Sequence, residues 1–143
     1  MKILAINPGS TSTKIAVYED EKVVLQKTIR HKAEELTPYN KIIDQYAFRK
    51  DLVLKQLAEE HCPIDFDAVI GRGGLLKPIP SGVYEVNERM KHDLRFATME
   101  HACNLGGLLA DEIASGIPGC KAYIADPVVV DELQDVARVT GSP

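Results

Sequence analysis

The sequence lacks the long apolar runs, basic stripes and aromatic clusters that would indicate a membrane or nucleic-acid partner. Its longest apolar runs fall far short of the roughly 20 residues that a membrane-spanning helix needs. The formal net charge of −4 is modest and aromatic residues make up only 6% of the chain. With no basic stripe and no aromatic platform for stacking bases, we expect neither a nucleic acid nor a membrane as a partner.

Cysteine is also scarce. The three cysteines, Cys62, Cys103 and Cys120, are odd in number and widely spaced, which argues against a disulfide framework or a zinc site. The chain enters a predicted strand at once and shows no signal-peptide pattern. Its 143 residues, 45% of them hydrophobic, suit one domain with a substantial core. We therefore expect a soluble cytoplasmic domain.

The segment LAINPGSTSTKIAV, residues 4–17, carries the clearest chemical signal. Two short apolar runs bracket a turn of proline, glycine, serine and threonine, which predicts a β-hairpin. Gly9 permits close approach of the backbone, consecutive N–H groups in a turn bind anions, and Lys14 adds positive charge. An ordinary polar hairpin and a phosphate-binding hairpin both fit this composition, and Asn7, an amide at the end of the first strand, favours the second. The candidate phosphate-binding residues are Asn7, Gly9, Ser10, Thr11, Ser12 and Lys14.

Hydrophobic patterning along the chain predicts a mixture of strands and helices. Alternation over Lys22–Ile29 adds a third strand to the hairpin and makes an antiparallel meander. After a polar connection at Ala33–Thr37, the pair Thr37-Pro38 predicts the start of a long helix that packs on the sheet. Phe66–Ile70 follows as a strand, which a strand–helix–strand unit places parallel and buried.

The second half of the chain continues this alternation. Its expected elements are an edge strand at Gly82–Val86, a helix at Glu88–Phe96 capped by Asn87, a helix at His101–Ala114, a strand at Ala122–Ala125 and a short helix at Asp131–Val136. The predicted fold class is α/β, with a three-stranded antiparallel meander, further parallel strands and flanking helices.

Arg72 follows an apolar strand and lies among glycines that imply positive φ angles or tight packing. These glycines are Gly71, Gly73 and Gly74. A guanidinium held in such a loop can bind a carboxylate through two parallel hydrogen bonds. It can equally tie down a loop carbonyl or pair with a structural carboxylate, and the spacing alone does not separate these interpretations.

Asp126 and His101 complete the candidate site. Asp126 follows a predicted strand, and open α/β folds place reactive groups at the carboxyl edge of a parallel sheet, although the pattern alone favours a turn or helix-capping aspartate. His101 and Asn104 open a helix, whose N-terminus stabilises anions, although a lone histidine is more often structural or exposed. The other histidines have polar sequence surroundings, and we assign no role to His31, His61 and His92.

The opening hairpin matches neither a Walker-type loop nor a dinucleotide-binding loop, since it lacks both the GK[ST] ending and the G-x-G-x-x-G pattern. Asn7–Lys14 instead resembles the first phosphate motif of the acetate and butyrate kinases, relatives of sugar kinases, actin and 70-kDa heat-shock chaperones. Residues 71–87, GRGGLLKPIPSGVYEVN, are very close to the corresponding segment of butyrate kinases. Residues 122–132 resemble the family strand whose aspartate is essential for phosphoryl transfer. The resemblance covers essentially all 143 residues.

This resemblance implies a ribonuclease-H-like fold and transfer of the γ-phosphate of ATP to a carboxyl group, with ATP/ADP and Mg²⁺ as cofactors. Arg72, with Gly73 and Gly74, would hold the acyl carboxylate, and His101 would stabilise the transferring phosphoryl group. Asp126 would either position Mg²⁺ or deprotonate the acceptor. Asn7 is a second candidate ligand for Mg²⁺. Because the acceptor, with a pKa below about 5, is already ionised at neutral pH, metal positioning is favoured.

Members of this family have two such domains and more than twice this length. We therefore expect residues 1–143 to be the N-terminal kinase domain, with the C-terminal nucleotide-binding domain missing, and the isolated chain to be inactive. The resemblance further implies butyrate or isobutyrate as substrate and a homo-oligomer at full length. The alternatives are an acetate, propionate or branched-chain acid kinase and, in another class, a non-catalytic phosphate-binding or assembly module.

Overall fold

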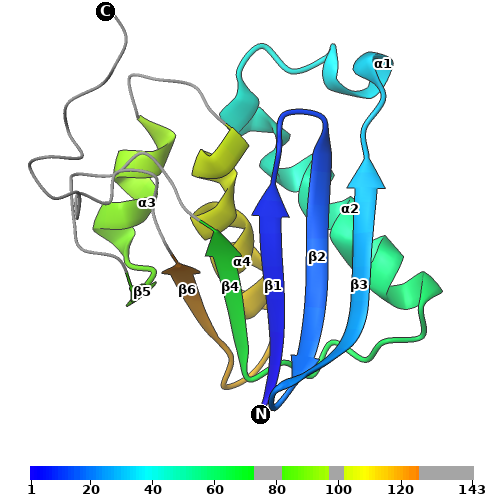
Figure 1. Ribbon diagram of the computed structural model, residues 1–143. Helices are drawn as coiled ribbons and strands as arrows, with labels where there is room; N and C mark the ends of the chain where they lie inside the picture. The colour runs from blue at the N-terminus through cyan, green and yellow to red at the C-terminus, as the bar shows by residue number, and fades with distance from the viewer. Residues whose placement is uncertain (73–81, 97–101, 126–143) are drawn as a thin grey trace, which may run out of the picture.

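The computed structural model describes residues 1–72, 82–96 and 102–125, which form a sheet with helices packed against it (Figure 1). The strands are β1 (Lys2–Pro8), β2 (Ser12–Glu19), β3 (Lys22–Arg30), β4 (Ala68–Arg72), β5 (Val83–Glu85) and β6 (Lys121–Ala125). The helices and 3-10 turns are α1 (Ala33–Leu36), η1 (Ile42–Gln45), α2 (Tyr46–Glu59), α3 (Glu88–Arg95), η2 (Ala102–Asn104) and α4 (Leu105–Ser115). None of the helices within these ranges has both the length and the apolar character of a membrane span.

The six strands lie in the order β3-β2-β1-β4-β6-β5. The first three form the predicted antiparallel meander, β4 pairs in parallel with β1, and β6 pairs in parallel with β4. Strand β5 is antiparallel to β6 and lies at the edge, as the sequence predicted. The predicted mixed α/β fold is therefore confirmed.

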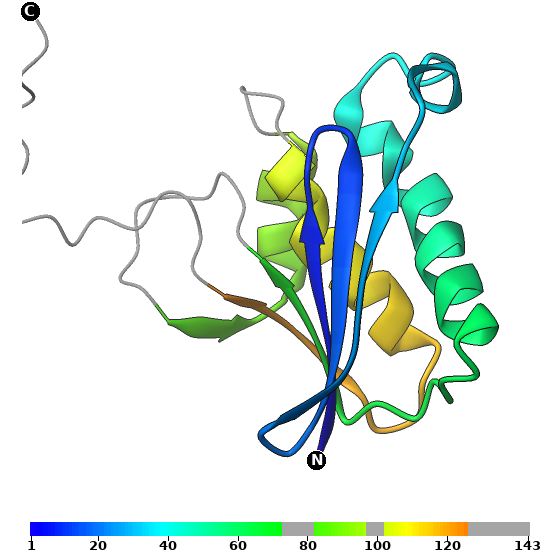
Figure 2. The same ribbon diagram turned by 45° about the vertical axis from the view of Figure 1, so that its right-hand side comes forward.

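Helices α2 and α4 pack on one face of the sheet, and Figure 2 shows both on the same side of the strands. Alternate residues of β1 and β2 point toward these helices, so Leu4, Ile15 and Val17 are almost completely buried. Leu57 of α2 and Leu109 of α4 meet them in the same core. The intervening residues of each strand face the opposite side, where the candidate site lies.

The long helix begins later than predicted, at Tyr46 and not at Thr37-Pro38. Residues 33–36 form a helical turn of their own with Thr37 as its C-cap, and the hydroxyl and the backbone N–H of Thr37 both donate to the carbonyl oxygen of Ala33. Pro38 carries no N–H with which to continue that turn. The prediction of a polar connection at 33–37, with Thr37 as the cap of the long helix, is therefore wrong.

The later element boundaries agree better with the sequence. Asn87 caps α3 as predicted, because its side-chain oxygen accepts a hydrogen bond of 2.9 Å from the backbone N–H of Met90. Helix α4 follows the short turn η2 and ends at Ser115, one residue beyond the predicted end, with Gly116 at its C-cap. The helix predicted at Asp131–Val136 lies outside the described residues.

Candidate functional site

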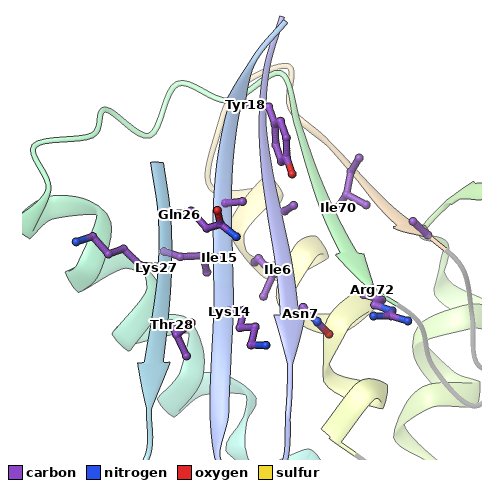
Figure 3. Close-up of a pocket in the computed structure, with 13 residues that line it drawn as sticks. Ile6, Asn7, Lys14, Ile15, Tyr18, Gln26, Lys27, Thr28, Ile70 and Arg72 are labelled. Atoms are coloured by element: carbon purple, nitrogen blue, oxygen red, sulfur yellow. The ribbon is translucent and has the colours of Figure 1, made fainter. Parts of the chain in front are cut away.

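An open groove of about 580 Å³ lies on the sheet face that points away from α2 and α4 (Figure 3). Small and apolar side chains form its floor, among them Ala5, Ala16 and Ile70. These residues occupy the strand positions between the buried ones, and β-strand alternation therefore turns them to the open face. The small side chains leave room above the central strands for a ligand.

Three of the predicted site residues lie in one row across this groove. Asn7 of β1 pairs directly with Lys14 of β2, and Arg72 ends β4, one residue beyond the partner of Ile6. Figure 3 shows Lys14, Asn7 and Arg72 side by side at the same end of the sheet. Because neighbouring strands lie about 4.8 Å apart, the strands that carry the two cations are separated by about 10 Å.

The groove is positively charged. Lys14 and Arg72 are exposed, and neither forms an ion pair within the described residues. Lys27, a third cation at the margin, is already paired with Glu60 at 3.1 Å. No aspartate or glutamate is among the described residues that line the groove. An anion that enters it therefore meets two cations, Lys14 and Arg72, that form no ion pair with another described residue.

The predicted phosphate-binding turn connects β1 to β2 just beyond Asn7 and Lys14. Ser10 and Thr11 at its tip are exposed, and Ser12 is half-buried. Gly9 donates its N–H to the carbonyl oxygen of Ser12 at 2.7 Å and closes the turn. No described residue accepts a hydrogen bond from the N–H of Ser10 or Thr11. These two N–H groups are therefore available to an anion.

Arg49 of α2 holds this turn from the core side, and sequence analysis missed it. Its side chain is 0% exposed. Nη1 donates to the carbonyl oxygens of Gly9 at 2.6 Å and Ser12 at 3.1 Å, and Nη2 donates to that of Ser10 at 3.3 Å. Gln45 Oε1 accepts from Nε at 3.1 Å and from Nη2 at 2.8 Å. Burial lowers the pKa of Arg49 to about 10.

A signal for this residue was present in the helical spacing. Arg49 shares one stripe of α2 with Val53 and Leu57, which are both fully buried, since residues four apart lie on the same helix face. Charged residues are rarely buried without a polar partner. An arginine on an apolar stripe therefore predicts a buried polar contact, although helical spacing does not say with which segment.

His31, to which the sequence analysis assigned no role, is part of the network around Arg49. It is 6% exposed, its Nε2 lies 2.8 Å from the hydroxyl of Thr13, and its ring packs against Phe48. Its Nδ1 has no hydrogen-bond partner in the described parts of the chain. Burial, followed by the positive charge of Arg49, lowers the pKa of His31. His61 and His92 are exposed.

Thr13 also lies on the core side. It is fully buried, and its hydroxyl accepts a hydrogen bond of 3.2 Å from Arg49 Nη1. The turn's hydroxyl groups therefore divide between two sides, since Ser10 and Thr11 face outward while Thr13 joins the network around the guanidinium.

The remaining predicted site residues lie outside the described residues: Gly73, Gly74, His101 and Asp126. Gly71 is described, and the expectation of tight packing is met there, because α4 crosses close to its backbone. No cluster of three or more histidine, cysteine, aspartate or glutamate side chains able to hold a metal occurs among the residues described. Asn7 contributes an uncharged oxygen to the groove, whereas Mg²⁺ sites normally include one or two carboxylates. The described residues therefore do not form a magnesium site by themselves.

Comparison with known proteins identifies relatives over the full chain, although no family model matches it. The chain is 64% identical over 143 residues to a probable butyrate kinase of Bacteroides thetaiotaomicron and 56% identical over 144 residues to butyrate kinase 2 of Clostridium acetobutylicum. These alignments cover 100% and 99% of this chain and 40% of each relative. The predicted resemblance to butyrate kinases is therefore confirmed, and the chain spans about 40% of the length of the curated relatives it matches.

Solved structures support the fold. The acetate kinase of Entamoeba histolytica superposes with a TM-score of 0.55 at 17% identity, over 100% of this chain and 39% of that one. The acetate kinase of Porphyromonas gingivalis gives a TM-score of 0.57, also at 17% identity, over 90% of this chain and 37% of that one. The predicted fold is thus shared with acetate kinases.

Proposed function

We propose that this chain, homologous over its full length to butyrate kinases, is the N-terminal domain of a short-chain fatty acid kinase. The reaction is transfer of the ATP γ-phosphoryl group to a carboxylate, which gives ADP and an acyl phosphate. The observation that carries the proposal is the row of Lys14, Asn7 and Arg72 in a groove whose described lining residues include no carboxylate. The substrate is butyrate or isobutyrate.

The row of residues suits the charge pattern of this reaction. Phosphoryl transfer depends mainly on positioning and on neutralisation of charge. Lys14 and the outward N–H groups of Ser10 and Thr11 bind the transferring phosphoryl oxygens, and Asn7 orients them. Arg72 binds the acid through two parallel hydrogen bonds. The cations reduce the repulsion between the two anionic reactants.

The acceptor needs no catalytic base. A short-chain carboxylic acid, with a pKa below about 5, is ionised at neutral pH. One carboxylate oxygen attacks the γ-phosphorus and forms the new P–O bond, while the bond from that phosphorus to the β,γ-bridging oxygen breaks and its electron pair leaves with ADP. Arg72 can hold the acid in the in-line position that this displacement requires.

The residues beyond the described ranges complete the proposal. Asp126 supplies the carboxylate for Mg²⁺, which neutralises phosphate charge when bound. His101 stabilises the transferring group, and Gly73 and Gly74 take part with Arg72 in binding the acid. A C-terminal domain supplies the adenosine pocket and forms the active-site cleft together with this chain. Closure of the two domains excludes water from that cleft. The full-length protein is a cytoplasmic homo-oligomer.

A chimera tests this proposal. Residues 1–143 are joined to the part of the Bacteroides thetaiotaomicron relative that follows its matched segment, and acyl phosphate formed from ATP, Mg²⁺ and butyrate is trapped with hydroxylamine. The relative itself serves as the positive control. We expect the chimera to be active and the 143-residue chain alone to show negligible turnover.

Arg72→Gln in the chimera separates a kinase from a module that only binds phosphate. Loss of a charge-assisted hydrogen bond worth about 1.5–3 kcal/mol raises KM for butyrate by about 10- to 100-fold. Arg89→Gln, which removes an exposed cation from α3, should leave KM unchanged. A folded chimera without hydroxamate product, or an Arg72→Gln chimera with unchanged kinetics, contradicts the proposed function.

A further inference from the structure

The turn carbonyls and the turn N–H groups point in opposite directions, and Arg49 fixes the carbonyls on the core side. In a trans peptide unit, the C=O and the N–H that follows it lie on opposite sides of the chain. The carbonyl oxygens of Gly9 and Ser10 both accept hydrogen bonds from the guanidinium on the core side. The N–H groups of the same two peptide units, those of Ser10 and Thr11, must therefore point away from the core.

The charge of the guanidinium is not compensated by an anion, because its side-chain partners, Gln45 of η1 and Thr13 of β2, are neutral. Gln45 is 6% exposed and accepts two of the hydrogen bonds of Arg49. No described carboxylate forms an ion pair with Arg49. His31, which reaches Arg49 through the hydroxyl of Thr13, adds no positive charge at neutral pH, because burial and Arg49 lower its pKa below the ordinary 6.5. One full positive charge therefore lies buried directly behind the turn.

We propose that Arg49 is a positioning residue for the phosphate-binding turn, and that Gln45 is a glutamine so that the guanidinium's charge stays available to the phosphoryl group. The inference rests on the proposed function, because it assigns the bound anion to the outer side of the same turn. Arg49 touches neither the phosphoryl group nor the acid. It acts through the backbone of Gly9, Ser10 and Ser12 and through its electric field.

Two substitutions separate geometry from charge. Gln45→Glu has nearly the same shape and keeps both acceptor contacts, but places a carboxylate against the guanidinium. Arg49→Lys keeps the charge but loses the planar set of donors that reaches several carbonyls at once. Lys55→Gln, on the exposed face of α2, changes the net charge by the same amount as Gln45→Glu and serves as the matched control.

The test is a titration of the 143-residue chain with inorganic phosphate, followed through the amide NMR signals of Ser10 and Thr11. We expect wild type and Lys55→Gln to bind alike. Gln45→Glu should fold with undiminished stability yet bind phosphate about ten-fold more weakly and with a shallower salt dependence, because one unit charge is neutralised. Arg49→Lys should shift both amide signals before phosphate is added and should also bind more weakly.

Each outcome of these titrations tests a different part of the inference. If phosphate does not move the two amide signals of the folded wild type, the phosphate-binding turn and this inference both fail. Equal affinity of wild type and Gln45→Glu overturns the role of the charge and leaves the proposed kinase function standing. Unshifted amide signals and wild-type affinity in Arg49→Lys overturn the positioning role. A Gln45→Glu chain that loses affinity together with stability shows a merely structural role.

Discussion

Gly71 of β4 and Gly106 of α4 touch backbone to backbone. A Cβ atom on Gly71 would lie within 3.0 Å of the carbonyl group of Gly106, and one on Gly106 would overlap the carbonyl oxygen of Arg72. No side chain larger than hydrogen fits at this crossing. Helix α4 therefore packs directly against the end of β4, where Arg72 carries the guanidinium of the groove.

Gly71→Ala should destabilise the fold, because the crossing has no space for a methyl group and the backbones must separate. We expect a loss of about 1–3 kcal/mol, the usual cost of overpacking, measured by urea unfolding. Gly116→Ala is the matched control at the end of α4, since its Cβ would lie no closer than 3.6 Å to the nearest atom. Equal urea midpoints for the two variants would refute the tight crossing.

Lys14→Gln should weaken phosphate binding without changing stability. Lys14 is exposed and makes no ion pair with another described residue, so the fold does not depend on it. A hydrogen bond to a charged group is worth about 1.5–3 kcal/mol, which corresponds to an affinity lower by about 10- to 100-fold in the phosphate titration. Lys22→Gln, at the opposite end of β2 and β3, should bind like wild type. An unchanged affinity in Lys14→Gln would remove this lysine from the site.

The stability of the fold should depend on pH through His31. Burial and Arg49 lower its folded-state pKa below the ordinary 6.5, while Glu35 opposes this in part. As the pH falls below 6.5 toward the folded pKa, the unfolded chain binds more protons than the folded one. The stabilisation that neutral His31 contributes to the fold is therefore complete above pH 6.5 and decreases as the pH falls from 6.5 toward the folded-state pKa.

The measurement compares free energies of unfolding at pH 7.5 and pH 5.5 for wild type and His31→Gln. Wild type should lose more stability on acidification, because glutamine does not titrate. His61→Gln is the control, since His61 is exposed, and it should follow wild type. Parallel losses in wild type and His31→Gln would show that the buried imidazole is not the titrating group.

Asn87→Ala should destabilise the protein by about 1 kcal/mol, because it removes the side-chain acceptor that satisfies the N–H of Met90 at the start of α3. Asn87→Asp keeps the acceptor and adds a negative charge at a helix N-terminus, so it should be neutral or slightly stabilising. Thermal unfolding of the three proteins gives the comparison. A midpoint in Asn87→Ala equal to that of wild type would mean that the cap does not contribute.

Local patterns predicted the strands well and the helix start poorly. The hairpin follows from alternation and turn residues that act within a few positions, and strand pairing in the structure agrees with it. Thr37-Pro38 has the composition of a helix N-terminus, but the same threonine serves equally well to end the preceding turn by bonding to Ala33. Whether Thr37 begins one helix or ends another depends on the tertiary path of the following residues, and a short sequence window holds no information about that path.

The amino-acid sequence by itself determined the antiparallel meander and the polar turn between its first two strands, because side-chain alternation and turn residues act locally. Only the tertiary structure decided that Arg49, some forty positions along the chain, reaches the carbonyl oxygens of Gly9 and Ser10. A buried cation can satisfy its donors with any backbone carbonyl in reach, and which carbonyls are in reach depends on how α2 packs against the sheet.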